Sequence, residues 1–324
     1  MDGFHLPIGT WVANAIDWVK DNLEWLLDGI SLVVSFLVDG LTRMLLTPHF
    51  IVVILIAALI AWLVTSWKLA LGTAISFLVI VGMGLWVPAM QTLALVLVAA
   101  LIALAIAIPL GIWSARNATV RAVMKPILDF MQTMPAMVYL IPAIVFFSIG
   151  VVPGLVATVI FSLPPGVRLT ELGIRGVDAE TVEAGQAFGA TPGQILRGIQ
   201  LPLAMPTIMA GVNQVIMLAL SMAVIAGMAG ADGLGKLVVG AISTLNTAAG
   251  VEAGLAVVLI AVFLDRVTAA LGAPGSHGSS LLGILSRRRT RRRREIAEAE
   301  ADAAAEATAQ ADQLVSAGAR HASP

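Results

Sequence analysis

The sequence has no cysteine and few ionisable side chains. None of the 324 residues is cysteine, which excludes disulfides, thiol catalysis and thiolate metal sites. The four histidines, His5, His49, His277 and His321, lie far apart in the chain without the spacing of metal ligands, so we expect no bound metal. Charged residues make up 12% of the chain and apolar residues 59%. A water-soluble domain of this length could not bury so much apolar surface, and lipid is the expected solvent.

Long stretches without charge divide the chain into membrane spans. A hydrocarbon core of about 30 Å requires roughly 20 apolar residues in each helix. Residues 69–115 and 130–167 contain no Asp, Glu, Lys or Arg, so each stretch has room for two spans. Residues 49–66, 198–231 and 250–264 supply one span each. The composition therefore predicts an all-α polytopic membrane protein with about seven transmembrane helices.

The positions of Lys and Arg predict the orientation, because cytoplasmic loops retain positive charge. If the N-terminus lies outside and seven spans follow, 16 of the 19 basic residues fall inside the cell. Only Lys20, Arg43 and Lys236 then remain outside. We therefore expect a multi-pass protein of the plasma (inner) membrane, with its N-terminus outside and its C-terminus in the cytoplasm. A cleaved signal peptide is not expected, since no basic residue precedes Lys20.

The first 48 residues form a separate segment with six acidic and two basic side chains. Trp11, Trp18 and Trp25 recur every seven residues and form one line along a helix, the tryptophan line. Acidic residues lie on one side of this line and apolar residues on the other. We interpret residues 1–48 as an extracytoplasmic amphipathic segment in the headgroup region. The alternatives are a core stripe of an extramembrane helix and an eighth span over residues 31–46.

Two further segments flank the predicted core. Residues 49–87 are predicted to hold two accessory transmembrane helices. Residues 272–324 are predicted to form a disordered cytoplasmic tail, in which the basic run 287–294 precedes an Ala- and Glu-rich stretch with too little apolar surface to pack. The basic run is interpreted as a topology anchor or, in a sharper hypothesis, as a binder of anionic lipid that responds to ionic strength.

The longest cytoplasmic loop follows the fifth span, over residues 168–204. Asp178 can cap a first short helix, and Gly189 tolerates the positive φ of a turn. The stretch 191–194 fits a capping box for a second helix, which Pro202 is expected to end. This local pattern predicts a rigid pair of short helices that could transmit a push from a soluble partner.

The same loop combines a Glu-Ala-Gly triplet with a later glycine and a distant Leu-Pro pair. The residues are Glu183, Ala184, Gly185, Gly189, Ile199, Leu201 and Pro202. Their spacing resembles the EAA loop of ABC importer permeases, from which it departs only in having Gly185 where that pattern has its second alanine. The resemblance implies that an ATPase subunit docks on this loop, and a chance amphipathic loop is the alternative.

Four stretches between residues 88 and 271 carry a wider resemblance. They read QTMPA at 132–136, YLIP at 139–142, LPPGVRLT at 163–170 and LPLAMPTIMAGVNQ at 201–214. In order and spacing they are similar to the permeases of glycine betaine and proline betaine importers, the ProW/OpuAB type. This resemblance implies a five-helix type I (MetI-like) core over residues 88–271 and import of a small osmolyte such as a quaternary amine.

The resemblance also implies an assembly that works by alternating access. Two copies of the permease would pair, two ABC ATPase subunits would dock on their EAA loops, and an extracytoplasmic substrate-binding protein would deliver the solute. ATP and Mg would be held by the ATPase, so this chain would bind no cofactor and catalyse no reaction. Lipid surrounds such a chain, and no nucleic acid is expected as a partner.

One stretch partly matches the motif of a phosphate-binding loop. The sequence GADGLGK at 230–236 matches the first seven positions of that motif, but Leu237 stands where a Ser or Thr should hold magnesium. No strand is expected before it, and the charge count places it outside the cell. We therefore expect no ATP there and interpret the stretch as a Gly-rich turn on which the binding protein docks.

Few side chains within the predicted spans can form hydrogen bonds. We identify Gln132, Thr133, Asn213 and Gln214, together with Pro135, as candidates for lining the translocation path. Proline leaves a backbone carbonyl unpaired, which is tolerated beside protein or a water-filled route. Asn213 and Gln214 could instead join helices, since such groups stabilise contacts in lipid by roughly 0.6 kcal/mol.

A secondary transporter driven by an ion gradient is the alternative from another class. Such proteins keep ionisable groups inside the membrane for ion coupling. Here only Asp129, Glu252, Asp265 and Arg266 fall near the ends of spans. The same scarcity argues against a membrane-embedded enzyme.

Overall fold

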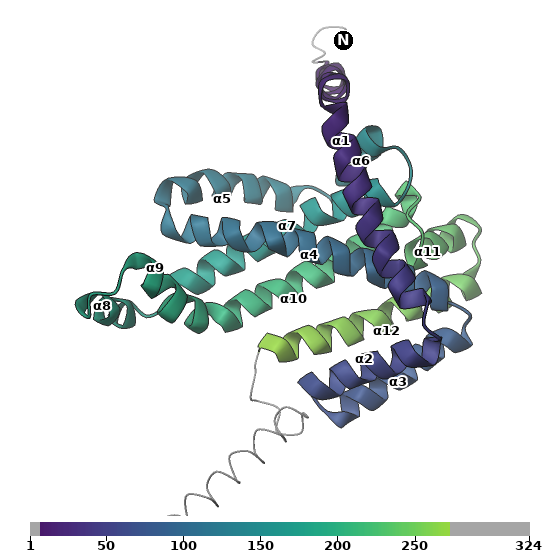
Figure 1. The fold of residues 1–324 in the computed structure, drawn as a ribbon. Coiled ribbons are helices and arrows are strands. Elements are labelled where there is room, and N and C mark those ends of the chain that lie inside the picture. Colours follow the sequence, from purple (N-terminus) through teal and green to yellow (C-terminus); the bar gives the residue numbers. More distant parts are fainter. Residues whose placement is uncertain (1–6, 273–324) are drawn as a thin grey trace, which may run out of the picture.

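The computed structural model describes residues 7–272, and every regular element in this range is a helix (Figure 1). The core consists of α4 (Trp86–Arg116), the pair α5 (Ala118–Thr133) and α6 (Leu140–Phe147), α7 (Val151–Arg175), α10 (Leu201–Ala226) and α12 (Thr247–Gly272). The predicted all-α fold is confirmed. Apart from Gly272, the tail predicted over residues 272–324 lies outside the described residues.

The helix α7 packs closely against both α4 and α10. A Cβ on Gly111 of α4 would lie 2.6 Å from Thr170 Cβ of α7, and a Cβ on Gly211 of α10 would lie 3.0 Å from Leu169 Cβ. Small residues at crossings let membrane helices approach closely, which is how they pack without a hydrophobic driving force. The three helices therefore form one tightly packed unit.

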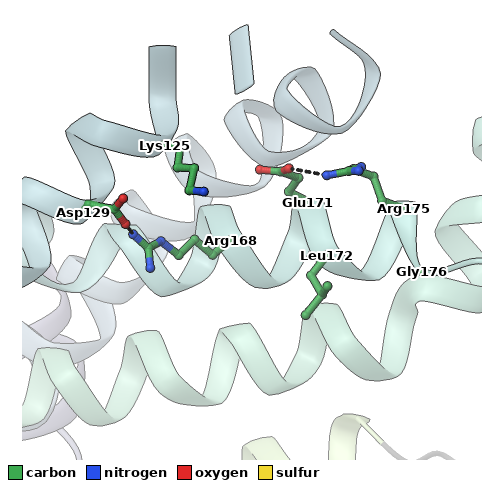
Figure 2. A pocket seen from close by; sticks show the side chains of 7 residues that line it. All are labelled: Lys125, Asp129, Arg168, Glu171, Leu172, Arg175 and Gly176. Atoms are coloured by element: carbon green, nitrogen blue, oxygen red, sulfur yellow. Dashed lines mark hydrogen bonds and ion pairs between the residues drawn. The ribbon is translucent and has the colours of Figure 1, made fainter. Parts of the chain in front are cut away.

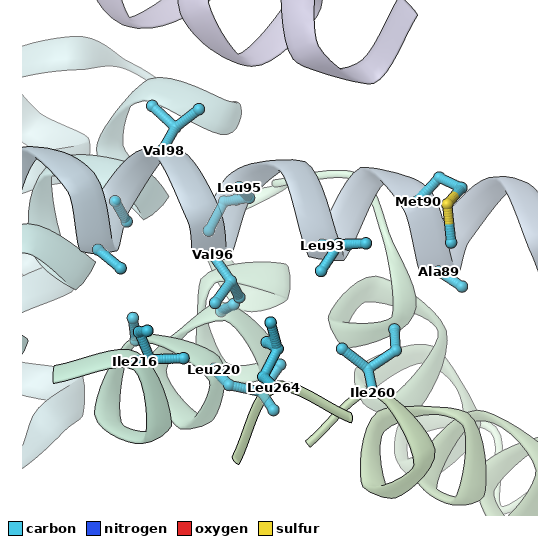
Figure 3. Packing of buried hydrophobic residues seen from close by; sticks show 14 of the residues in the cluster. Ala89, Met90, Leu93, Leu95, Val96, Val98, Ile216, Leu220, Ile260 and Leu264 are labelled. Atoms are coloured by element: carbon cyan, nitrogen blue, oxygen red, sulfur yellow. The ribbon is translucent and has the colours of Figure 1, made fainter. Parts of the chain in front are cut away.

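The first half of α4 is enclosed by protein. Its side chains pack on Ile216 and Leu220 of α10 and on Ile260 and Leu264 of α12 (Figure 3). From residue 89 to residue 100 only two positions are not fully buried. A helix that is apolar on every side is expected where protein covers every side.

The predicted accessory helices form a hairpin of α2 (Phe50–Val64) and α3 (Trp67–Gly82). The hairpin lies beside α12 (Figure 1), and the rings of Phe77 and Phe263 meet edge to face at 5.3 Å between centroids. The two helices have 15 and 16 residues, which corresponds to a length of about 23 Å. They are shorter than the core helices α4, α7, α10 and α12, each of which is long and apolar enough to cross a membrane.

In the region predicted to hold the fourth span, α5 and α6 form a broken helix that is bent by 108° across a 3-10 turn (Ala136–Tyr139). Pro135 has no N–H for the carbonyl of Met131, and the Tyr139 hydroxyl donates a hydrogen bond to that carbonyl instead. The sequence placed the start of this span near residue 130, whereas the helix α5 begins at Ala118. The prediction excluded the charged part of α5, where Asp129 forms an ion pair with Arg168 of α7 and Lys125 lines the same hollow.

The helix α1 (Ile8–Leu46) crosses the bundle at a steep angle to α4 (Figure 1). Its second half packs on α4 through the buried Val34 and Val38. The tryptophan line is 59% to 72% exposed, so it is not a core stripe of the described chain. A helix in the headgroup region and an eighth span both remain predictions, and α1 is long and apolar enough for the second.

Candidate functional site

The predicted pair of short helices lies at the end of the bundle opposite to α11 (Leu234–Ser243) (Figure 1). α8 (Ala179–Ala187) and α9 (Pro192–Ile195) connect α7 to α10. They project beyond the end of α4 (Figure 1), and Glu183 and Ala184 are exposed on α8. The EAA loop is therefore placed to meet a partner outside the bundle.

Both helices of the EAA loop begin as their sequence predicts. The Asp178 carboxylate accepts a hydrogen bond from the Glu180 N–H at 3.1 Å. In the capping box, the Thr191 N–H donates to Gln194 Oε1 at 2.7 Å, and the Gln194 N–H donates to Thr191 Oγ1 at 3.4 Å. These caps satisfy N–H groups that a helix start leaves free.

The turn between the two helices depends on Gly189. Its φ is +78°, in the left-handed region that favours glycine. The Ala190 N–H donates to the Gly185 carbonyl at 3.1 Å, and the Gly189 N–H donates to the Gln186 carbonyl at 2.9 Å. This pair of bonds is a Schellman motif, which ends α8 and reverses the chain. The predicted role of Gly189 in the turn is confirmed.

The prediction that Pro202 ends the second helix is wrong. A π-helical turn (Leu196–Gln200) follows α9, and the Leu201 N–H donates to the Leu196 carbonyl. α10 starts at once, so residues 192–229 form one continuous helix. Pro202 is tolerated because it lies in the first turn of α10, where the wider π turn relieves the clash of its ring with the preceding carbonyl. Any movement of α9 is thus passed directly to α10.

Gly185 is the point at which α8 touches the second helix. A Cβ at this position would lie 2.7 Å from Ile199 Cδ1 and 3.6 Å from Ile195 Cγ1. Ile195 is buried and Ile199 is half-buried. The departure from the usual alanine therefore lets the side chain of Ile199 lie closer to α8.

Replacing Gly185 by alanine is expected to leave uptake within about twofold of the parent. The only close contact is the end of a flexible isoleucine side chain, and alanine is about 1 kcal/mol better than glycine inside a helix. Gly185→Leu should instead push α8 away from Ile199 and lower the ATPase stimulation of a reconstituted complex. Equal ATPase stimulation in the leucine variant would show that this contact does not matter.

Phe188 follows α8 directly and is 93% exposed. A large aromatic side chain on a rigid turn is typical of the residues that anchor a partner. Little in the sequence distinguishes Phe188 from a core residue, except its place immediately before Gly189. It joins Glu183 and Ala184 on the exposed surface of the loop.

A charged hollow of about 480 Å³ lies where α5 meets α7 (Figure 2). Asp129 of α5 forms an ion pair with Arg168 of α7. Glu171 of α7 accepts a hydrogen bond from Ser114 Oγ of α4 at 2.8 Å. Lys125 of α5 points toward these groups (Figure 2). The cluster ties α4 and α5 to the part of α7 that leads into the EAA loop, which the sequence did not reveal because its members are far apart in the chain.

The residues predicted to line a path lie in two places. Gln132, Thr133 and Pro135 are exposed at the bend between α5 and α6. Gln214 is exposed on α10, whereas Asn213 is half-buried and forms a hydrogen bond to α12. The 3-10 turn at this bend packs on α10 near Met222, about 12 Å along that helix from Gln214. One copy of the described chain does not bring the two groups together, and their role in a path stays a prediction.

The glycines of the stretch 230–236 form a turn and allow close contacts between helices. Gly230 and Gly233 have φ angles of +85° and +130°. The Leu234 N–H at the start of α11 donates to Thr92 Oγ1 of α4 at 2.8 Å. A Cβ on Gly235 would lie 2.6 Å from two backbone carbonyl oxygens of α10. The predicted turn is confirmed as the element that holds α11 on α4 and α10, while docking of a partner there stays a prediction.

Comparison with known proteins identifies related sequences. The family model described as "Binding-protein-dependent transport system inner membrane component" matches residues 107–273. The glycine betaine transport system permease protein OpuAB of Bacillus subtilis is 49% identical over 264 residues, which cover 81% of this chain and 93% of OpuAB. The glycine betaine/proline betaine transport system permease protein ProW of Escherichia coli is 46% identical over 275 residues, which cover 84% of this chain and 78% of ProW.

The fold is similar to that of a chain in the solved inward-facing conformations of the MetNI methionine ABC transporter. The TM-score is 0.53 at 22% identity, and the match covers 58% of this chain and 94% of the other. This likeness supports the predicted MetI-like core. The family match and the relatives extend over the broken helix, α7, the EAA loop, α10 and α12. The chain therefore belongs to the binding-protein-dependent transport system inner membrane components and is the permease subunit of an ABC importer.

Proposed function

We propose that this permease imports glycine betaine, proline betaine or a related quaternary amine. The observation that carries the proposal is an identity of 46% to 49% with relatives named for glycine betaine transport. The chain has a single tyrosine, whereas a quaternary ammonium group is recognised mainly by an aromatic cage. Selection of the solute is therefore assigned to the extracytoplasmic binding protein, and this chain supplies the passage.

The proposed assembly contains two copies of this chain and two ATPase subunits that bind ATP and Mg. The ATPases dock on α8 and α9, where Phe188 and Glu183 are exposed. The α8 and α9 end faces the cytoplasm and α11 faces outward, as the distribution of Lys and Arg predicts. The exposed Ile149, next to Gly230, belongs to the outer surface that meets the binding protein.

The proposed mechanism is alternating access driven by the EAA loop. Closure of the ATPases on ATP moves α8 and α9, and the unbroken helix over residues 192–229 carries that movement into the membrane. The tightly packed unit of α4, α7 and α10 then turns the path outward and, after hydrolysis, inward. Gln132, Thr133, Pro135 and Gln214 line this path in the paired permease. A secondary transporter is not favoured, because the family couples transport to a binding protein.

Transport by the reconstituted complex tests the proposal. The permease is placed in proteoliposomes with its ATPase and binding-protein subunits, and uptake of labelled glycine betaine, proline betaine, choline and carnitine is measured. We expect uptake of a betaine that requires ATP on the α8 side and persists after an ionophore dissipates all ion gradients. Uptake without ATP, or uptake abolished by the ionophore alone, would contradict an ATP-driven importer. Uptake of only an unrelated solute would contradict the betaine assignment.

A further inference from the structure

A polar cluster joins α10 to α12 within an otherwise apolar contact. Asn213 Nδ2 donates a hydrogen bond to Asp265 Oδ1 at 3.0 Å. Thr268 Oγ1 lies 2.5 Å from Asn213 Oδ1 and 2.7 Å from the Leu264 carbonyl oxygen. Asn213 and Asp265 are half-buried and Thr268 is buried. We call these three side chains, Asn213, Asp265 and Thr268, the clamp.

Asp265 is unusual for a residue on a membrane helix. Within residues 7–272 no Lys, Arg or His forms an ion pair with it. The neighbouring Arg266 is exposed, on a different side of α12. Ionisable residues on membrane helices are expensive and are kept where they have a function. In the described chain, the side chain of Asp265 forms its hydrogen bond to another helix with Asn213 of α10.

The position of the clamp suggests what that function is. Asn213 lies on the continuous helix that starts at α9, about 20 Å along α10 from the π turn. The other contacts between α10 and α12 include Leu220, Ile260 and Leu264 (Figure 3). Apolar side chains can slide past one another, whereas a pair of directional hydrogen bonds holds two helices in one register.

We propose that the clamp makes α12 move with α10, so that the movement of the EAA loop reaches the last helix of the core. Asn213, Asp265 and Thr268 are positioning residues that transmit movement and need not touch the solute. The inference rests on the proposed ATP-driven mechanism. The α2–α3 hairpin would then move together with α12 and α10, because α12 packs on both helices of that hairpin.

Exchanging the two partners of the clamp tests the inference. In N213D a second carboxylate faces Asp265, and the hydrogen bond becomes a repulsion. In N213D/D265N the carboxylate and the amide have changed places on side chains of equal length, so the bond between α10 and α12 is restored while Thr268 can still donate to position 213. We expect N213D to transport at least about tenfold less solute per ATP hydrolysed, and the double variant to recover to within about twofold of the parent.

The decisive measurement is the number of solute molecules imported per ATP hydrolysed. The Tm of the purified complex is measured as well. A merely structural role would lower the Tm and leave solute per ATP unchanged in the folded protein. The inference is overturned if N213D keeps the parental ratio, or if the double variant folds and stays as uncoupled as N213D. If N213D does not fold, a double variant that folds and couples still supports the clamp.

A third variant covers the case in which neither change at position 213 yields folded protein. T268V removes only the hydroxyl group, and we expect it to lower solute per ATP by about threefold. Its matched control is T73V, because Thr73 is also buried, on α3, and forms no side-chain hydrogen bond between helices in the described chain. Equal ratios in T268V and T73V overturn the inference. Absence of ATP-driven uptake by the parent complex would instead be a failure of the proposed function.

Discussion

Gly189→Val is expected to abolish ATP-driven uptake while membrane insertion stays normal. The φ of +78° at this position is a left-handed conformation that strains a β-branched residue by about 2 kcal/mol. Strain of this size shifts the loop away from its turn by about 30-fold. α8 would then no longer present Phe188 and Glu183 in one arrangement to the ATPase. ATPase stimulation and solute uptake of the reconstituted complex measure the effect.

Two control variants separate backbone strain from bulk. Gly193→Val adds the same side chain in the same loop, at a position with no atom within 4 Å and no positive φ, and should retain at least about half of the uptake. Gly189→Asn should retain more uptake than the valine variant, because asparagine tolerates the left-handed region. Equal loss in the valine variants at positions 189 and 193 would show that the turn is not what matters.

Gly235→Ala is expected to destabilise the whole permease. A Cβ on Gly235 would lie 2.6 Å from the carbonyl oxygens of Ala223 and Val224, and a Cβ on the facing Gly227 would lie 2.3 Å from the Gly235 carbonyl carbon. Because the obstacle is backbone, α11 must leave α10 to accommodate a single methyl group. Overpacking of this kind costs about 3 kcal/mol, and we expect the Tm in detergent to fall by about 10 °C.

The matched control for this variant is Gly240→Ala in the same helix. No atom lies within 4 Å of a Cβ at Gly240, and alanine is the better helix former. The control should therefore leave the Tm unchanged or slightly higher. A Tm for Gly235→Ala equal to that of the control would mean that the close contact between α10 and α11 is absent in the membrane.

The local structure of the EAA loop could be predicted because short-range chemistry decides it. The cap at Asp178, the capping box at Thr191 and the turn at Gly189 each depend on residues within a few positions. The error at Pro202 has the opposite origin. Proline usually stops a helix, but here a π turn places Pro202 in the first turn of the next helix. No residue of the motif indicates that π turn.

Long-range pairing could not be predicted from the sequence. The sequence placed Asp129 near the end of a span and Arg168 at the start of the loop 168–204, and the structure joins them in one ion pair. Asn213 was one of two polar residues that could join helices, but its partner Asp265 is 52 positions away. The exposure of Phe188 likewise depends on how α8 projects from the bundle. These contacts and exposures follow from how the helices pack together, which the composition and the spacing of residues do not determine.

The short hairpin of α2 and α3 has a consequence for the lipid around it. If these helices span the membrane as predicted, their length of about 23 Å falls about 7 Å short of a hydrocarbon layer of about 30 Å. Membranes accommodate a short helix by thinning locally, at a cost that rises with each ångström of mismatch. Since the hairpin lies against α12, the strain that a bilayer with longer acyl chains places on the hairpin would be transmitted to this last core helix. The energetics of the transport cycle would then depend on membrane thickness as well as on ATP.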